Sequence, residues 1–150
     1  MVKEIEGDLI ELTLANTFNV IVHGCNCFCI QGKGIALQMR NTFDTHKYPL
    51  ERIEEKGNIN KLGLIDCRLY YKGDCCVQVV NAYTQYEPGK NLDYEALTLC
   101  LRKINHEFRG HHIGLPRIGC GIAGGNWVAV KKIIEKELID CDVTIINYVK

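Results

Sequence analysis

Two glycine-rich loops constrain the fold of this chain more than any other feature. The first, residues 24–34, follows the apolar run Val20-Ile21-Val22 and leads into a helical pattern. The second, residues 116–125, follows Ile113-Gly114-Leu115 and also leads into a helical pattern. Glycine lets a backbone approach a ligand closely, and a helix start offers unpaired N–H groups with a partial positive charge. Two such strand–loop–helix units indicate an α/β fold that can hold a diphosphate between its loops.

The rest of the chain continues the alternation of strands and helices. Six strands are predicted, at Val2–Glu6, Phe18–His23, Leu62–Tyr71, Cys75–Tyr83, Gly110–Pro116 and Val143–Tyr148. Four helices are predicted, at Ile35–Phe43, Pro49–Lys56, Asp93–Phe108 and Trp127–Leu138. Asp93 and Asn126 are the expected N-caps of the last two helices, and Lys72-Gly73-Asp74 is the expected turn of a hairpin. The pattern favours a sandwich of helices around a largely parallel or mixed sheet, with ligands at the carboxyl ends of its strands.

Length and charge limit the classes of function. The 150 residues, 47% of them apolar, predict a single domain over 1–150. The formal net charge is zero, so the chain has no basic field for binding nucleic acid, and no partner of that kind is expected. No apolar run approaches the roughly 18 residues of a membrane span, and the first residues lack a secretory apolar region. We therefore expect a cytoplasmic protein without membrane contact, and the sequence leaves its oligomeric state open.

The nine cysteines raise the question of a metal site. Cys25, Cys27 and Cys29 alternate along the first loop, with His23 close by in sequence. Structural zinc sites use Cys-x2-Cys spacing, whereas this spacing is Cys-x-Cys. Reduced, buried thiols are favoured over zinc, and neither a metal nor a cofactor is expected. A cysteine-dependent phosphatase is also excluded, because the loop cysteines lack an arginine six positions later; Cys120, for example, is followed there by Asn126.

Two phosphate-binding motifs can be compared with the loops directly. Gly119-x-Gly121-x-x-Gly124 formally matches the dinucleotide fingerprint, but that motif belongs in the first βαβ unit, and here only one predicted strand follows. Gly32-Lys33-Gly34 is not a Walker A motif, because no serine or threonine follows the lysine. Neither a nicotinamide dehydrogenase nor a P-loop nucleotidase is predicted.

Three segments together resemble the macrodomain family. They are Gly7-Asp8-Leu9, the Asn26 loop ending in Gly32-Lys33-Gly34-Ile35-Ala36, and Gly121-Ile122-Ala123-Gly124. The resemblance covers essentially the whole chain and implies a three-layer α/β/α sandwich that binds ADP-ribose. Within the family, His-Gly-Cys-Asn-Cys and Pro-Arg-Ile-Gly-Cys-Gly are similar to the branch that contains ADP-ribose-1''-phosphate phosphatases and terminal ADP-ribose glycohydrolases.

The resemblance also implies roles for individual residues. Asp8 would accept a hydrogen bond from the adenine amino group, Tyr148 could flank the adenine, and Asn26 would reach the distal ribose. Both loops would cradle the phosphates, and Lys33 could neutralise phosphate charge. The expected substrate-binding residues are Asp8, Leu9, Gly24, Asn26, Gly32, Lys33, Gly34, Ile35, Ile118, Gly119, Cys120, Gly121, Ile122, Ala123 and Tyr148.

Two departures from the family pattern guide the choice of reaction. The glycohydrolases use a lysine in the helix after the first loop and an aspartate in the second loop. Here residues 37–43 contain no lysine, and Ala123 stands at the aspartate position, where it leaves room for a larger 1''-substituent such as phosphate. The prediction is a phosphatase that converts ADP-ribose-1''-phosphate into ADP-ribose and phosphate.

The expected catalytic residues are His23, as a base for the attacking water, and Asn26. A histidine has a pKa suited to proton transfer near neutral pH. Hydrogen bonding of His23 to backbone at the end of a strand is the structural alternative. Two other functions stay open at this point: a non-catalytic module that binds ADP-ribose, and a hydrolase of acyl or protein-linked ADP-ribose esters.

Overall fold

The computed structural model describes residues 2–49 and 56–148. Within them, six strands form one sheet: β1 (Val2–Gly7), β2 (Val20–Asn26), β3 (Ile65–Lys72), β4 (Cys75–Gln85), β5 (His112–Leu115) and β6 (Asp142–Tyr148). The strand order is β1-β6-β5-β2-β4-β3. All neighbouring strands run parallel except β3 and β4, which form the antiparallel hairpin expected around Gly73. The predicted mixed sheet is therefore confirmed.

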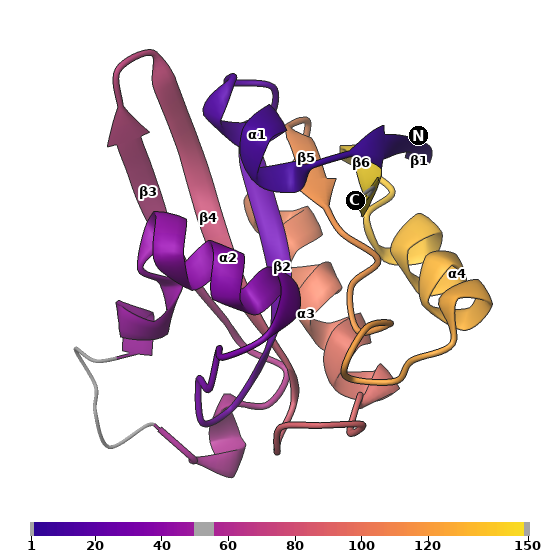
Figure 1. The fold of residues 1–150 in the computed structure, drawn as a ribbon. Coiled ribbons are helices and arrows are strands. Elements are labelled where there is room, and N and C mark those ends of the chain that lie inside the picture. The colour runs from indigo at the N-terminus through magenta and orange to yellow at the C-terminus, as the bar shows by residue number, and fades with distance from the viewer. Residues whose placement is uncertain (1, 50–55, 149–150) are drawn as a thin grey trace.

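Helices cover both faces of this sheet (Figure 1). On one face lie α1 (Leu9–Leu14) and α2 (Gly34–Phe43), and on the other lie α3 (Tyr94–Glu107) and α4 (Trp127–Glu137). Side chains alternate along β2, so that Val20 and Val22 join the core under α3 and α4 while Ile21 joins the core under α1 and α2. The expected three-layer sandwich is thus present, with two cores separated by the sheet.

The predicted caps of the two long helices are confirmed. Asp93 accepts a hydrogen bond from the amide of Ala96 at 3.0 Å, and Asn126 accepts one from Ala129 at 3.1 Å. These side chains satisfy amide groups that a helix start leaves unpaired.

The structure contains helical elements that the sequence did not predict. α1 was not predicted; Asp8 caps it by accepting from the amide of Glu11 at 3.0 Å. The 3-10 turn η2 (Ile59–Lys61) was not predicted either. The helix expected at Pro49–Lys56 lies mostly outside the described residues.

The bounds of several strands also differ from the prediction, and the changes in β2 and β5 are among those that affect the site. β2 extends to Asn26 rather than ending at His23, which places His23 inside the strand. β5 is confined to His112–Leu115, so the second glycine-rich loop begins as soon as Leu115 ends the strand. The carboxyl ends of the five parallel strands meet at one edge of the sheet, and both loops start there.

Candidate functional site

A cleft of about 1080 Å³ lies at this edge of the sheet. Its walls come from the ends of β1 and β6, the first glycine-rich loop with the start of α2, the second glycine-rich loop, and the segment that follows β4. In residue numbers these are 6 and 9, 24–26, 30–36 and 38, 84–85, 88–89, 116–123, and 146–148. Segments far apart in the sequence are brought together because parallel strands end on the same side of a sheet.

Asn26 shapes the first loop. Its side-chain Oδ1 accepts from the amides of Phe28 and Ile30, both at 3.1 Å, and its Nδ2 donates to the carbonyl of Ile30 at 3.0 Å. Asparagine commonly folds a turn around its own side chain in this way. Asn26 also lines the cleft, so one residue both fixes the loop and faces the site.

The first loop ends at the start of α2, whose first residues line the cleft. Lys33 is the N-cap residue, but its side chain makes no capping hydrogen bond, and Gly34 follows with a positive φ of 60°. The first N–H groups of a helix without a side-chain cap bind anions readily, because they add unpaired donors to the helix dipole.

The second loop closes over the first. Gly119 and Gly124 adopt positive φ values of 74° and 75°, and the amide of Gly125 donates to the carbonyl of Gly119 at 2.8 Å. Ile122 then reaches across the cleft, since its Cδ1 lies 3.7 Å from the position a Cβ would take on Gly34. The two glycine-rich loops therefore meet over one cleft.

The other end of the cleft is formed by the ends of β1 and β6. Leu9 is buried in its wall, and Tyr148 lines it with 58% of its surface exposed. Asp8 is not among the lining residues; it lies between Glu6 and Leu9, which are, and its carboxylate caps α1. One oxygen of Asp8 is used by that cap.

The structure does not bring His23 into the cleft. Its ring is fully buried between β2 and the helices on the α2 side, and its Nε2 lies 2.7 Å from Oδ1 of Asn81. Burial lowers the pKa of His23 to about 4, partly opposed by the hydrogen bond with Asn81. As a correction to the sequence analysis, His23 is a neutral core residue that does not itself line the cleft, because β2 continues beyond it. Its Nε2 lies 3.5 Å from Sγ of Cys25, which does line the cleft.

The loop cysteines are buried thiols, as the sequence analysis favoured. Burial raises the pKa of Cys27 to about 11 and raises that of Cys25 as well. The side chain of Gln31 donates to the sulfurs of Cys25 and Cys29, at 3.7 Å and 3.1 Å. Over residues 2–49 and 56–148, no group of three or more His, Cys, Asp or Glu side chains is arranged to hold a metal ion.

Sequence reasoning missed several residues of the cleft. Thr84 and Gln85 at the end of β4 line it, as do Gly89 and Arg117. Gln85 fixes the segment after β4, because its Nε2 donates to the carbonyls of Glu87 and Gly89 at 2.7 Å and 2.9 Å. The strand prediction ended at Tyr83, so it stopped just before these residues.

Arg117 is held in place at the rim of the cleft. Its Nε donates to Oδ1 of Asn147 at 2.8 Å, its guanidinium lies 4.9 Å from the ring centre of Trp127, and Glu4 is 3.7 Å away. Three contacts on one guanidinium restrict its motion beside the end of β6. The sequence around Arg117 did not predict these contacts, because Asn147 and Glu4 are distant from it in the sequence.

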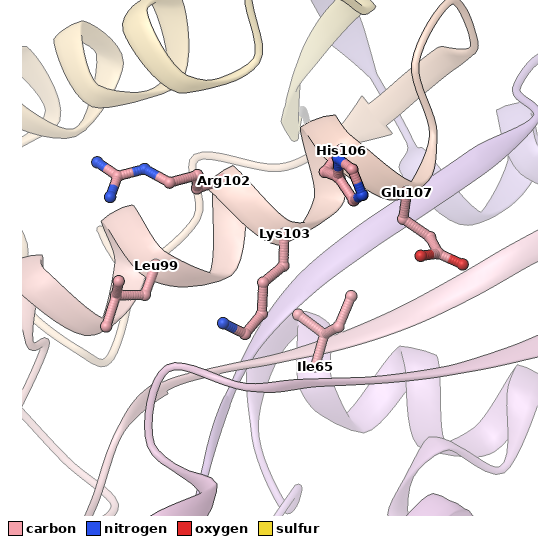
Figure 2. Close-up of a pocket in the computed structure, with 6 residues that line it drawn as sticks. All are labelled: Ile65, Leu99, Arg102, Lys103, His106 and Glu107. Carbon is pink, nitrogen blue, oxygen red and sulfur yellow. The ribbon is translucent and has the colours of Figure 1, made fainter.

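A second hollow of about 480 Å³ lies between α3 and the start of β3 and shares no residue with the cleft. Figure 2 shows side chains of α3 around it, among them Lys103, His106 and Glu107, with Ile65 from β3. Arg102, also at its edge, is paired with Glu137 at 3.1 Å. The hollow has no glycine-rich loop and no helix start in its lining.

No helix in the described part of the chain is long and apolar enough to cross a membrane.

No family model matches the chain. Comparison with individual proteins finds similarity in sequence and in fold. An uncharacterized 17.5 kDa protein from the tk-vs intergenic region of Enterobacteria phage T4 is 34% identical over 153 residues, which span 99% of this chain and 97% of that protein. The macrodomain of Thermus aquaticus DarG superposes with a TM-score of 0.74 at 23% identity, covering 100% of this chain and 99% of that one.

A structure that was solved with a bound ligand is also similar in fold. The Trypanosoma brucei macrodomain, solved in complex with ADP-ribose, superposes with a TM-score of 0.62 at 19% identity, covering 99% of this chain and 64% of that one.

Proposed function

We propose that this chain, which has the fold of the macrodomains it resembles, is a member of the macrodomain family, and that its cleft binds ADP-ribose and hydrolyses the phosphomonoester of ADP-ribose-1''-phosphate. The phosphatase reaction is the more specific part of this proposal. It converts the substrate into ADP-ribose and inorganic phosphate.

The observation that carries the proposal is the meeting of the two glycine-rich loops over one cleft. Residues at the start of α2 line the same space as Gly119 and Gly121, and Ile122 spans it to within 3.7 Å of the Cβ position of Gly34. The amide of Cys120, between those two glycines, donates to the carbonyl of Arg117 at 3.0 Å. Opposed rows of N–H groups suit a diphosphate, whose oxygens accept hydrogen bonds on both sides.

The two ends of the cleft suit the two ends of such a ligand. Leu9 and Tyr148 offer apolar and aromatic surface for the adenine, with Asp8 beside them as an acceptor for the amino group. Asn26 and Ala123 lie at the loops, where the distal ribose would lie. This orientation follows the roles that the family resemblance implies for these residues.

Space in the cleft favours a substituent larger than a hydroxyl. At Gly32 and Gly121 a Cβ atom would meet no heavy atom within 4 Å, and Ala123 adds only a methyl group. Among the described lining residues, Lys33 and Arg117 are cationic and Glu6 is anionic. The space and the cations together support a 1''-phosphate.

The chemistry required is attack of water on phosphorus and departure of the ribose 1''-oxygen with a proton. Loop amides and the start of α2 can stabilise the charge that develops on the phosphoryl oxygens. Because His23 does not face the cleft, we assign the orientation of water to Asn26, whose Nδ2 has a second hydrogen beyond the one given to Ile30. The substrate phosphate itself can accept the proton of that water.

Two measurements on one preparation test the proposal. Calorimetry should give tighter binding of ADP-ribose than of AMP or NAD, and incubation with ADP-ribose-1''-phosphate should release phosphate. Binding of ADP-ribose without phosphate release would replace the phosphatase by a binding module. Release of acyl groups from ADP-ribose esters in place of phosphate would identify the ester hydrolase.

A further inference from the structure

Thr84 has a buried hydroxyl that is not used within the protein. Its side chain is 1% exposed, yet its Oγ1 has no hydrogen-bond partner among the described residues. A buried polar atom without a partner costs stability, so such atoms are uncommon and call for an explanation. Thr84 also lines the cleft, which places this unused hydroxyl at the site.

The backbone around Thr84 is irregular at the same point. Along the parallel pair of β2 and β4, Cys25 is opposite Tyr83 and Asn26 is opposite Gln85, so Thr84 is an extra residue of β4 without a partner in β2. Such a bulge redirects a side chain and is common beside functional sites. The carbonyl of Thr84 accepts from the amide of Asp93 at 2.9 Å, which anchors the bulge to the start of α3.

The hydroxyl faces the side of Gly24 that has no side chain. A Cβ built there would lie 3.0 Å from Oγ1 of Thr84, 3.3 Å from Cγ1 of Ile118 and 3.9 Å from the amide nitrogen of Gly119. Gly24, Thr84 and Gly119 all line the cleft. A hydroxyl and a backbone amide therefore lie beside the same glycine in the cleft wall, where a side chain at position 24 would crowd the hydroxyl.

We propose that Thr84 is a substrate-binding residue whose hydroxyl donates a hydrogen bond to a phosphate oxygen of the bound ligand, beside the amide of Gly119. This inference rests on the proposed binding of an ADP-ribose derivative and adds a side-chain donor to a cradle otherwise built from backbone amides. A ligand oxygen supplies the partner that the hydroxyl lacks in the free protein. The unpaired hydroxyl lowers the stability of the free protein, and binding of the ligand removes this cost.

The test uses three variants that change one group each. Thr84→Val keeps the shape of the side chain and removes the hydroxyl, whereas Thr84→Ser keeps the hydroxyl. Thr144→Val is the matched control, because Thr144 is equally buried but its Oγ1 is 2.9 Å from Nε2 of His112. ADP-ribose affinity is measured by calorimetry and the melting temperature by calorimetric unfolding without ligand.

Thr84→Val is expected to weaken ADP-ribose binding roughly 10- to 100-fold, the range for a hydrogen bond to a charged group, without lowering the melting temperature. Thr84→Ser should keep most of the affinity. Thr144→Val should do the reverse of Thr84→Val, with a lower melting temperature and unchanged affinity. This opposite response separates a ligand contact from a structural role.

Two results would overturn the inference. If Thr84→Val binds ADP-ribose as tightly as the wild type, the hydroxyl does not contact the ligand. If Thr84→Val lowers the melting temperature as Thr144→Val does, the hydroxyl already has a partner in the free protein. Failure of the wild type itself to bind ADP-ribose would instead reject the proposed function, so the two failures are distinguishable.

Discussion

His23 and Asn81 face each other across β2 and β4, with Nε2 of the histidine 2.7 Å from Oδ1 of the asparagine. Nδ2 of Asn81 donates to the carbonyl of Thr45 at 2.9 Å, which fixes the orientation of the amide. Oδ1 can only accept, so the neutral ring of His23 carries its proton on Nε2. Nδ1 is then the site of any added proton, and it is buried without a hydrogen-bond partner among the described residues.

This arrangement predicts that the protein loses stability in mild acid. The pKa of His23 is about 4 in the folded state against 6.5 for an ordinary histidine, because burial disfavours the charged ring. Between these values the unfolded chain binds a proton that the folded chain does not, so the free energy of unfolding falls as the pH drops through this window. The expected loss is up to about 3 kcal/mol, and it stops below pH 4. Urea unfolding at a series of pH values measures it.

The matched variant for this measurement is His23→Gln, which keeps a donor toward Asn81 and cannot titrate. Because Glu4 also has a shifted pKa, lowered mainly by its hydrogen bond with Lys131, the informative quantity is the difference in pH dependence between wild type and variant. Equal pH dependence in both proteins would show that His23 is protonated as easily in the fold as in the unfolded chain.

A second prediction concerns the role of His23 in turnover. A general base in contact with the attacking water typically contributes about 10²- to 10⁴-fold in rate. Since His23 lies in the core and not in the cleft wall, His23→Gln is expected to release phosphate from ADP-ribose-1''-phosphate at a rate close to that of the wild type. The comparison is made at pH 7.5 per mole of protein that binds ADP-ribose, which corrects for unfolded material. A loss of about 10²- to 10⁴-fold in the rate of phosphate release would show that His23 acts as a general base.

Much of the fold could be predicted from local patterns. The helices α3 and α4 and their caps Asp93 and Asn126 were predicted from short-range signals, and all of them are confirmed. α1 could not be found this way, because six residues make fewer than two turns and give no clear periodicity. The length of β2 also depends on long-range pairing, since Gly24, Cys25 and Asn26 belong to the strand only because β4 lies beside them.

The candidate site was predictable where it consists of consecutive residues. The glycine-rich loops are visible in the sequence, and the structure brings both into one cleft. Thr84 was missed because it lies in the cleft wall at the bulge between β2 and β4, which no local pattern encodes. The sequence analysis predicted His23 at the end of a strand and therefore near the ligand. In the structure three more residues of β2 follow His23, so the edge of the sheet that faces the cleft lies beyond its ring.

A third prediction separates the two tasks of Asp8. One carboxylate oxygen caps α1, and the other is proposed to accept from the adenine amino group. Asp8→Asn keeps an oxygen for the cap but turns the second acceptor into a donor, which would face the donor of the adenine. We expect ADP-ribose affinity to fall by roughly 1–3 kcal/mol while the melting temperature changes little.

Asp93→Asn is the control for Asp8→Asn, since Asp93 caps α3 at the same 3.0 Å and does not line the cleft. It should leave both affinity and melting temperature near the wild type. Asp8→Ala should reduce both, because it removes the cap as well. An unchanged affinity of Asp8→Asn in calorimetry would remove the carboxylate from the adenine site.

A fourth prediction concerns metal ions. The described residues offer no group of His, Cys, Asp or Glu side chains suited to a metal, and burial keeps the thiols of Cys25 and Cys27 protonated by raising their pKa. Phosphate release should therefore survive treatment with EDTA. Loss of turnover on chelation, with recovery on adding zinc or magnesium, would show that a metal takes part.

The last prediction tests the diphosphate cradle itself. Gly32 lines the cleft, has no heavy atom within 4 Å of its Cβ position and requires no positive φ, so valine fits there without disturbing the fold. Its branched side chain would occupy the space of the phosphates, and Gly32→Val should weaken ADP-ribose binding by at least roughly 10-fold, the loss of one or more charged hydrogen bonds. Gly125→Val provides the contrast, because its Cβ would collide with Leu92 and lie 2.6 Å from the carbonyl oxygen of Gly119. That variant should lose melting temperature, whereas Gly32→Val should keep it. Wild-type affinity in a folded Gly32→Val protein would mean that the diphosphate does not lie against the first loop.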